Sequence, residues 1–352
     1  MLSKRSELMD GTRTPAPRQP SAKQAQSQAP PAPRYQESLS QLVARILDQL
    51  SVSAWLPAAI LVATLLIAGS IRSAGGDFHA ALTSIVSMNA ASLILLTGAV
   101  ILATTLTQAF EFEAIRLLEG YWGPGLVGRA PGRLGCAWHA RRRKNVRSAI
   151  RSVQYTARCQ ALSRLKESGI PDAQLDVLRA DWDMRDSHNA SKRIAKAARA
   201  IRWLAYADPA LARRLEALTR KADEYPRTVP ILPTRLGNTL RSYEERVLPV
   251  SGASGLEGFV QREFDRLPAS IRVEHDQFRQ RLDLYCSLVI VIWLAGAASA
   301  ALLFHVGWAY AAGGLVLTAL LSWLSYRAAI ASAREYGVIL VTIAGLVGDA
   351  AT

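Results

Sequence analysis

Three aspartates and a histidine stand close together near the middle of the sequence and have the side chains of a metal site. Asp181, Asp183, Asp186 and His188 fall within eight residues. Carboxylates gathered in a turn supply the oxygen ligands that hard cations prefer. The same spacing fits a solvated helix end, because a tryptophan and an arginine stand among the acidic residues. We favour the helix end and predict no metal.

Three glycines further upstream spell the dinucleotide fingerprint. Gly123, Gly125 and Gly128 have the spacing G-x-G-x-x-G, which binds a pyrophosphate where a strand leads into a helix. Here the segment follows a predicted helix and contains Pro124, so we interpret 123–135 as a hinge-like loop. The sequence also contains no HExxH, GxSxG or Walker pattern, which argues against the chemistries that need them. We therefore expect no enzymatic activity and no cofactor.

Four consecutive basic residues follow this glycine-rich segment: Arg141, Arg142, Arg143 and Lys144. Basic side chains close to a bilayer attract anionic lipid headgroups. They also fix the orientation of neighbouring membrane helices without binding any particular lipid. Both interpretations stay open, so the cluster is a candidate headgroup site or a purely topogenic one.

Two separated segments carry a second group of polar residues. Arg116 and Glu119 lie in Arg-Leu-Leu-Glu-Gly-Tyr-Trp, and Arg235 and Asn238 lie in Pro-Thr-Arg-Leu-Gly-Asn. Arginine pairs well with carboxylates through its forked donors. These four residues are therefore candidates for a structural network between the two segments, and solvated charges are the alternative.

Thr104, Thr107 and Gln108 are candidate pore-lining residues near one end of an apolar segment. Their polar side chains could face an aqueous axis between copies of the chain. Threonine hydroxyls in such helices also bond to their own backbone, and that alternative stays open.

The elements that must position these residues include several apolar helices. Half of the residues are hydrophobic, and each of four blocks is free of charge and about 20 residues long, as a bilayer core of about 30 Å requires. The blocks are 52–71, 90–110, 284–304 and 307–326. Short connections join the first two and the last two, which predicts two transmembrane hairpins, 52–110 and 284–326.

Residues 111–283 lie between the hairpins and are polar and basic. They hold 32 Lys and Arg against 21 Asp and Glu, a net +11 of the chain's +14. Apolar residues recur at helical spacing and no strand alternation is found. The three cysteines form no CxxC pair, which favours reduced thiols. The predicted fold is an all-α membrane protein, with four transmembrane helices flanking a basic helical cytosolic domain.

The two ends of the chain have different compositions. Residues 1–35 are rich in Pro, Gln, Ser and Ala, which predicts a disordered tail. Residues 36–51 have apolar positions at helical spacing, which predicts an amphipathic helix on the membrane surface. Residues 327–352 are predicted to form a C-terminal cytosolic helix that packs on the domain or lies along the bilayer.

The distribution of basic residues predicts the orientation. Seven precede Val52, two follow Tyr326, and one falls in the connections assigned to the outside. Basic residues concentrate on the cytoplasmic side of membrane proteins, so both termini and the central domain are expected to face the cytoplasm of a bacterial cell, with the spans in its inner membrane. This placement explains the high pI without nucleic acid.

The two segments 116–122 and 233–238 also carry a family resemblance. They are similar to signatures of uncharacterised multi-pass membrane proteins of actinobacteria-like, high-GC bacteria. The resemblance covers roughly residues 90–352 and implies a membrane topology and location, without an activity. In that family a Tyr-Gly pair and a Trp-Pro pair usually follow the second signature, whereas 247–258 has neither.

These observations lead to three hypotheses about function. The leading one is a non-enzymatic scaffold or sensing module at the cytoplasmic membrane face, with the bilayer, its anionic headgroups and an unidentified protein as partners. The alternative is a subunit of a small homo-oligomeric ion channel or pore. A membrane-tethered nucleic-acid binder is a third hypothesis, and we do not expect nucleic acid as a partner.

Overall fold

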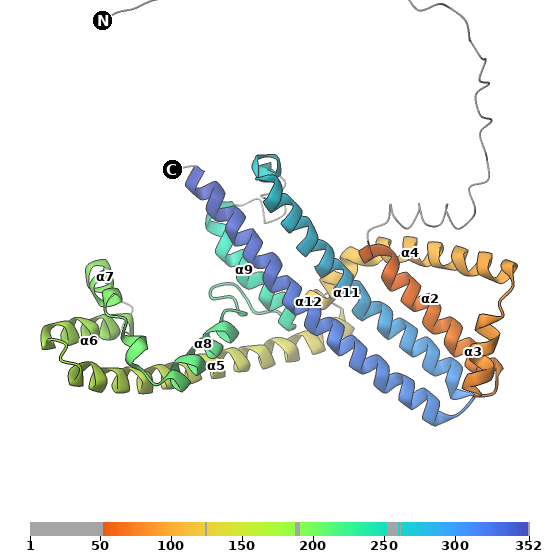
Figure 1. The fold of residues 1–352 in the computed structure, drawn as a ribbon, viewed down its shortest axis with the longest axis horizontal. Coiled ribbons are helices and arrows are strands. Elements are labelled where there is room, and N and C mark those ends of the chain that lie inside the picture. Colours follow the sequence, from red (N-terminus) through yellow and green to blue (C-terminus); the bar gives the residue numbers. More distant parts are fainter. Residues whose placement is uncertain (1–51, 124, 187–190, 252–259, 261, 351–352) are drawn as a thin grey trace, which may run out of the picture. The chain divides into compact units, whose positions relative to one another are not determined.

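The computed structural model describes residues 52–123, 125–186, 191–251, 260 and 262–350 (Figure 1). The predicted disordered tail (1–35) and surface helix (36–51) lie outside these residues. The regular secondary structure of the described part is helical, with no strand, which confirms the all-α class. Four helices are long and apolar enough to cross a membrane. They are α2 (Val52–Ser73), α4 (Ala90–Glu119), α11 (Ala269–Phe304) and α12 (Trp308–Ala350).

The two C-terminal helices form a tight antiparallel pair. Residues 305–307 join α11 to α12, and the helices pack along much of their length. In the part of this interface nearer the turn, a Cβ added to Gly296 would lie 2.7 Å from the Cβ of Thr318. Thr318 and Ser322 are buried. Small residues therefore let the two backbones approach closely, a packing mode that is also typical of helix pairs in lipid.

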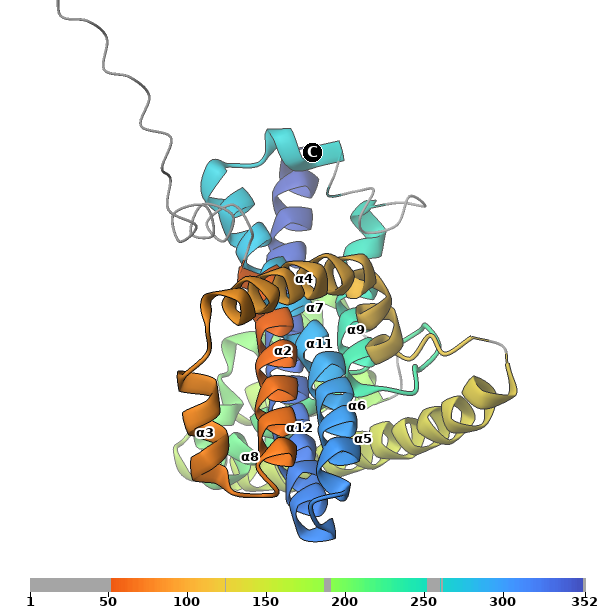
Figure 2. The same ribbon diagram turned by 90° about the vertical axis from the view of Figure 1, so that its right-hand side faces the viewer.

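The two N-terminal apolar helices are arranged differently. α2 packs on α11, and α4 packs on both α2 and α11. Figures 1 and 2 show α2, α11 and α12 side by side, whereas α4 crosses them. A short helix, α3 (Phe78–Val86), lies between α2 and α4, so this pair is not joined by a tight turn.

Local side chains define the ends of these helices. Asp77 caps α3 by accepting from the backbone N–H groups of His79 and Ala80, and Asn89 caps α4 by accepting from that of Ser92. Gly120 ends α4 in the left-handed conformation, with φ 100°, which glycine adopts without steric cost.

The longest connection between the four apolar helices begins with α5 (Leu126–Glu167). The predicted hinge-like loop over 123–135 is wrong beyond Gly125, because the chain is helical from Leu126 onward. A Cβ on Gly128 would lie 2.8 Å from the carbonyl carbon of Trp122, and one on Gly135 would lie 2.7 Å from the Cβ of Pro233. These glycines therefore allow close packing of a helix and are not part of a loop.

Shorter helices complete a small helical arm with α5. They are α6 (Asp172–Asp186), α7 (Lys192–Ala200), η1 (Trp203–Tyr206) and α8 (Pro209–Ala222). Leu165, Leu175, Leu178 and Trp182 form the buried centre of its outer part. α8 and η1 pack along α5.

The largest core lies between α9 (Arg235–Ser251), α11 and the second half of α12. η3 (Phe264–Arg266) precedes α11. Ala329, Ala333 and Leu340 of α12 are buried in this core. The predicted C-terminal helix is therefore a continuation of α12, and no helix end separates it from the fourth apolar block.

Candidate functional site

The two segments 116–122 and 233–238 meet in the structure. The hydroxyl of Thr234 donates to the main-chain carbonyl of Glu119 at 2.8 Å. A Cβ on Gly237 would lie 2.9 Å from the carbonyl carbon of Glu119, and one on Gly120 would lie 2.7 Å from Cδ of Pro233. The end of α4 and the start of α9 thus touch backbone to backbone, and only glycine fits at both contact points.

Asn238 holds the turn that leads into α9. It is fully buried, and its amide donates to the carbonyls of Leu232 and Thr234 at 2.7 and 2.6 Å. Its side-chain oxygen accepts from the N–H of Leu232 at 2.9 Å. Both ends of the amide are satisfied, so this residue fixes the shape of the 232–238 segment.

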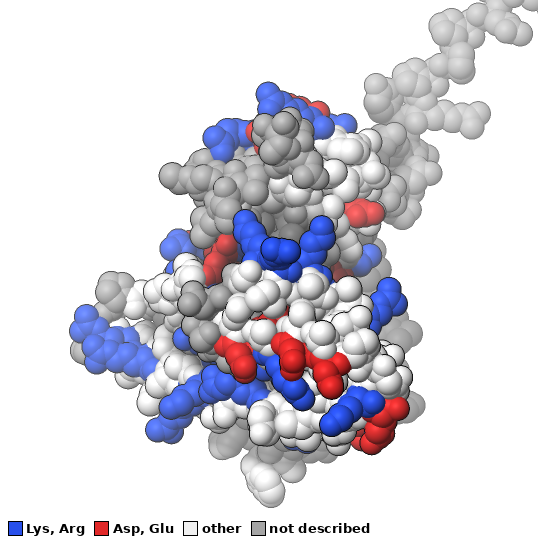
Figure 3. All heavy atoms as spheres, turned by 90° about the vertical axis from the view of Figure 1, so that its left-hand side faces the viewer, with Lys and Arg blue, Asp and Glu red and all other residues white. Residues whose placement is uncertain are grey.

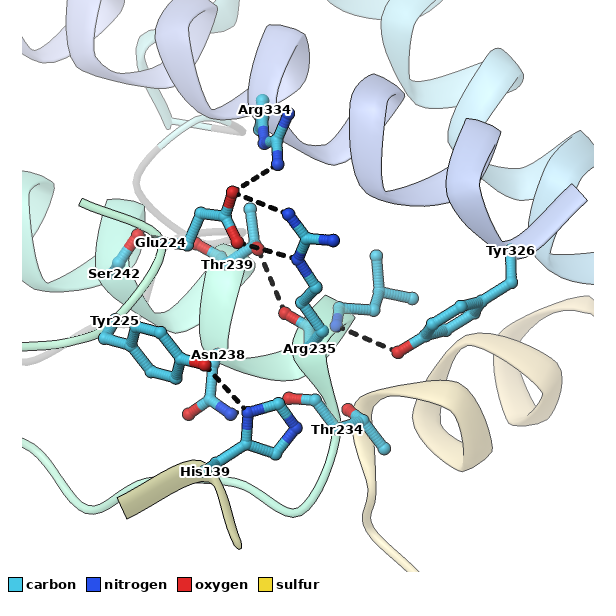
Figure 4. Close-up of polar contacts among 11 residues, drawn as sticks. His139, Glu224, Tyr225, Thr234, Arg235, Asn238, Thr239, Ser242, Tyr326 and Arg334 are labelled. Atoms are coloured by element: carbon cyan, nitrogen blue, oxygen red, sulfur yellow. Dashed lines mark hydrogen bonds and ion pairs between the residues drawn. The ribbon is translucent and has the colours of Figure 1, made fainter. Parts of the chain in front are cut away.

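An ion network lies next to this turn (Figure 4). Arg235 of α9 and Arg334 of α12 both donate to the carboxylate of Glu224, which lies in the connection between α8 and α9. Burial alone would raise the pKa of Glu224, but the hydrogen bonds and charges of the two arginines outweigh it, and the pKa is lowered. The carboxylate is therefore ionised at neutral pH and joins three parts of the chain.

A buried histidine and tyrosine lie beside the ion network. Nδ1 of His139 in α5 is 3.1 Å from the hydroxyl oxygen of Tyr225. Burial, with the nearby charges of Arg142 and Arg235, lowers the pKa of His139 to about 4. The imidazole is therefore neutral at physiological pH, and burial raises the pKa of Tyr225 as well.

Further hydrogen bonds attach α5 and α12 to the same connection. Arg143 donates to the carbonyl of Pro226 at 3.0 Å, and the thiol of Cys136 to that of Ile231 at 3.3 Å. On the opposite side, the N–H of Leu236 donates to the hydroxyl of Tyr326 in α12 at 3.2 Å. We call residues 223–238, with the Glu119 carbonyl of α4 and the side chains of α5 and α12 that hold them, the junction.

The four residues predicted as a structural network are brought to the junction in different ways. Arg235 and Asn238 are central to it, and Glu119 contributes its carbonyl. Arg116 lies one turn away, 3.9 Å from Glu113 in an exposed ion pair. Sequence reasoning missed Glu224, since no spacing pattern links it to residue 235 or 334.

The basic cluster is divided by the helix on which it lies. Arg141, Arg142 and Lys144 are exposed on α5, and the guanidinium of Arg142 stacks on Trp138 at 5.1 Å. Arg143 is partly buried in the junction. Figure 3, which views the molecule from the side of the α5–α8 arm, shows basic side chains spread in several groups with acidic ones between them.

The candidate pore-lining threonines bond within their own helix. The hydroxyl of Thr104 donates to the carbonyl of Val100 at 2.7 Å, and that of Thr107 to the carbonyl of Thr104 at 2.9 Å. Thr104 is buried, whereas Gln108 is exposed. The arrangement matches the alternative in which these hydroxyls satisfy their own backbone.

The aspartate cluster lies at the end of α6. Asp181 is buried, Asp183 is exposed and Asp186 is the last residue of the helix. His188 lies outside the described residues. Among the residues that the structure does describe, no group of three His, Cys, Asp or Glu side chains is placed to hold a metal ion.

Comparisons of the chain with protein-family models, with curated proteins and with solved structures found no match.

Proposed function

We propose that the chain is a four-span integral protein of the bacterial inner membrane, with both termini and its basic helical domain in the cytoplasm. We further propose that it works there without catalysis, as a scaffold or sensing module. The second hairpin is α11 and α12, and α2 and α4 are the first pair of spans. α4 has 30 residues and is longer than the bilayer core is thick. A helix of this length can tilt in the membrane, which agrees with the crossing of α4 over its neighbours.

The apolar surface of the long helices supports membrane insertion. Leu95, Leu102 and Phe110 are at least 63% exposed along α4. Trp308 and Val316 of α12 are exposed to a similar degree. Apolar surface of this extent is unusual in a soluble monomer and is covered in a bilayer by lipid chains.

The junction is the single observation that carries the functional proposal. Glu224 ties α12 to α9 through two arginines, and Thr234 ties α9 to the end of α4. Arg143 attaches α5, the first helix of the arm, to the same connection. A movement of α4 or α12 is therefore expected to move α5 as well. A sensing module needs such a coupling between its membrane helices and its cytoplasmic domain.

Cysteine labelling tests the topology. Cys159 is exposed on α5, and Ser84 is exposed on α3. In protein with Cys136→Ser and Cys286→Ala, a membrane-impermeant maleimide should reach Ser84→Cys in intact cells and Cys159 only after permeabilisation. Labelling of both sites in intact cells would contradict the proposal.

Hydrogen exchange tests the coupling. In vesicles of short-chain and long-chain lipids, exchange over α5–α8 should differ between the two bilayers in the wild type. Glu224→Gln should remove that difference, whereas Glu216→Gln, in an exposed pair with Arg220 on α8, should keep it. Equal exchange in both bilayers for the wild type would contradict a sensing role.

The channel alternative receives less support from the geometry. Thr104 is buried within the chain, so its side chain does not face an axis between copies. The two threonine hydroxyls are already bonded to backbone carbonyls.

A further inference from the structure

A cavity of about 560 Å³ lies between α2, α4 and α11. This volume falls within the roughly 300–1,000 Å³ typical of small-molecule sites. Most of its wall is apolar, and the side chains that form it come from all three helices: Leu61, Leu106, Phe110, Ile290, Val291 and Leu294. Water has little to bond to along such a wall, so the occupant must itself be largely apolar.

One polar side chain in the cavity wall is buried and is not hydrogen-bonded in the described part of the structure. Ser287 of α11 is 5% exposed, and its hydroxyl oxygen finds no hydrogen-bond partner among the described residues. Thr104 and Thr107 of α4 donate to carbonyls of their own helix. Ser299 of α11 also lacks a partner within that part of the chain, but it does not line the cavity. Burying a hydroxyl without a hydrogen-bond partner costs free energy. We therefore expect the molecule in the cavity to offer Ser287 a hydrogen-bond acceptor.

The cavity is amphipathic along its length. Glu113 and Tyr121 line one end, and the guanidinium of Arg116 lies 5.9 Å from the centre of the Tyr121 ring. Ser287 is one helical turn from Asp283, where the charged part of α11 gives way to its apolar part. The lining residues of α4 run from Ala103 to Leu117, which are 14 positions apart or about 21 Å along the helix.

We propose that the cavity is a binding site for one acyl chain of a diacyl lipid from the bilayer. The ester carbonyl of the lipid accepts a hydrogen bond from Ser287, and its headgroup lies at the end formed by Glu113 and Tyr121. The chain fills the apolar part toward Leu294. This inference rests on the membrane insertion proposed above and adds a specific lipid site between the spans.

Photo-crosslinking tests where the lipid chain lies. The probe is phosphatidylethanolamine with a diazirine on one acyl chain, present in trace amounts in vesicles that hold the full-length protein. We expect crosslinks on the peptides that carry Phe110 and Val291. Val291→Trp fills the cavity and should lower that labelling at least fivefold, whereas the same substitution at Val316, which is 70% exposed on α12, should leave it unchanged.

Ser287→Ala tests the hydrogen bond without adding volume. The wild type should retain ester-linked probe over its ether-linked analogue by roughly two- to tenfold, the ratio that one net hydrogen bond supplies. The alanine variant should lose that preference while still binding both lipids. Equal preference in the variant and the wild type would overturn the role of Ser287.

The crosslinking pattern also separates this inference from the proposed topology. Equal labelling of the two tryptophan variants, with crosslinks spread over the outward faces of α4 and α12, would overturn the site and leave the spans in place. Absence of crosslinks from all four apolar helices would overturn both.

Discussion

The guanidinium of Arg235 donates to both carboxylate oxygens of Glu224, with Nε 2.7 Å from Oε2 and Nη2 2.8 Å from Oε1. Arg334 reaches the same carboxylate from a helix that also contains the fourth apolar block. One acidic side chain thereby holds the connection before α9 to two helices at once.

We predict that Glu224→Gln destabilises the protein by about 3 kcal/mol, because it leaves two partly buried guanidinium groups without their counter-charge. The loss is expected at the low end of the range for buried pairs, since Arg334 remains partly accessible to water. Thermal unfolding in detergent measures it. The matched change Glu216→Gln affects an exposed pair and should cost no more than about 0.5 kcal/mol; equal losses in the two variants would contradict the role of the network.

We predict an acid-sensitive stability that depends on His139. Its pKa is about 4 in the folded protein, below the ordinary value of 6.5, so the unfolded chain takes up the proton first. The contribution of neutral His139 to the free energy of unfolding should therefore be fully present above pH 6.5 and should decline as the pH falls toward 4. His139→Gln should flatten this part of the profile, whereas His79→Gln, at an exposed position of α3, should not.

We predict that Gly237→Ala separates the start of α9 from the end of α4. The new methyl group would meet the carbonyl of Glu119, and overpacking of this kind costs about 1–3 kcal/mol. Gly345→Ala is the control, because a Cβ there meets nothing within 4 Å; it should leave stability unchanged or raise it by about 0.5–1 kcal/mol. Urea unfolding in mild detergent compares the two, and a neutral Gly237→Ala would refute the contact.

We predict that Gly296→Ala loosens the pairing of α11 with α12. A methyl group at this position meets the side chain of Thr318, so the helices must move apart. The midpoint of unfolding in mixed micelles with rising SDS should fall. Gly313→Ala, on α12 with nothing within 4 Å, should keep the wild-type midpoint, and a shared shift in both variants would argue against close packing at Gly296.

The long apolar helices could be predicted from the sequence because hydropathy is a local property. A block such as 90–110 is uninterrupted, and a helix is the structure that satisfies its backbone in lipid. The end of the fourth block was harder to place. Arg327 and Arg334 look like the flank of a span, yet α12 continues past them, because Ile330, Leu340 and Ile343 pack in the core with α9 and α11.

Only part of the junction could be predicted from the sequence. Arg235 and Asn238 were recognised as members of a short motif, but their partners are set by tertiary contacts. Glycines such as Gly128 and Gly135 are common in loops. Here they lie in a helix, and the absence of a side chain lets Trp122 and Pro233 pack directly against it. Ser287 gave no signal in the sequence, because its importance comes from the cavity around it.

The spacing of the ion network along the chain determines when it can form during synthesis. Glu224 leaves the ribosome 110 residues before Arg334, and the whole of α11 is translated between them. The contact can close only after the third apolar helix and α12 as far as Arg334 have been made. Until then Arg235 is the one arginine of the pair that can neutralise the Glu224 carboxylate, so a chain that stops before Arg334 keeps only part of the ion network.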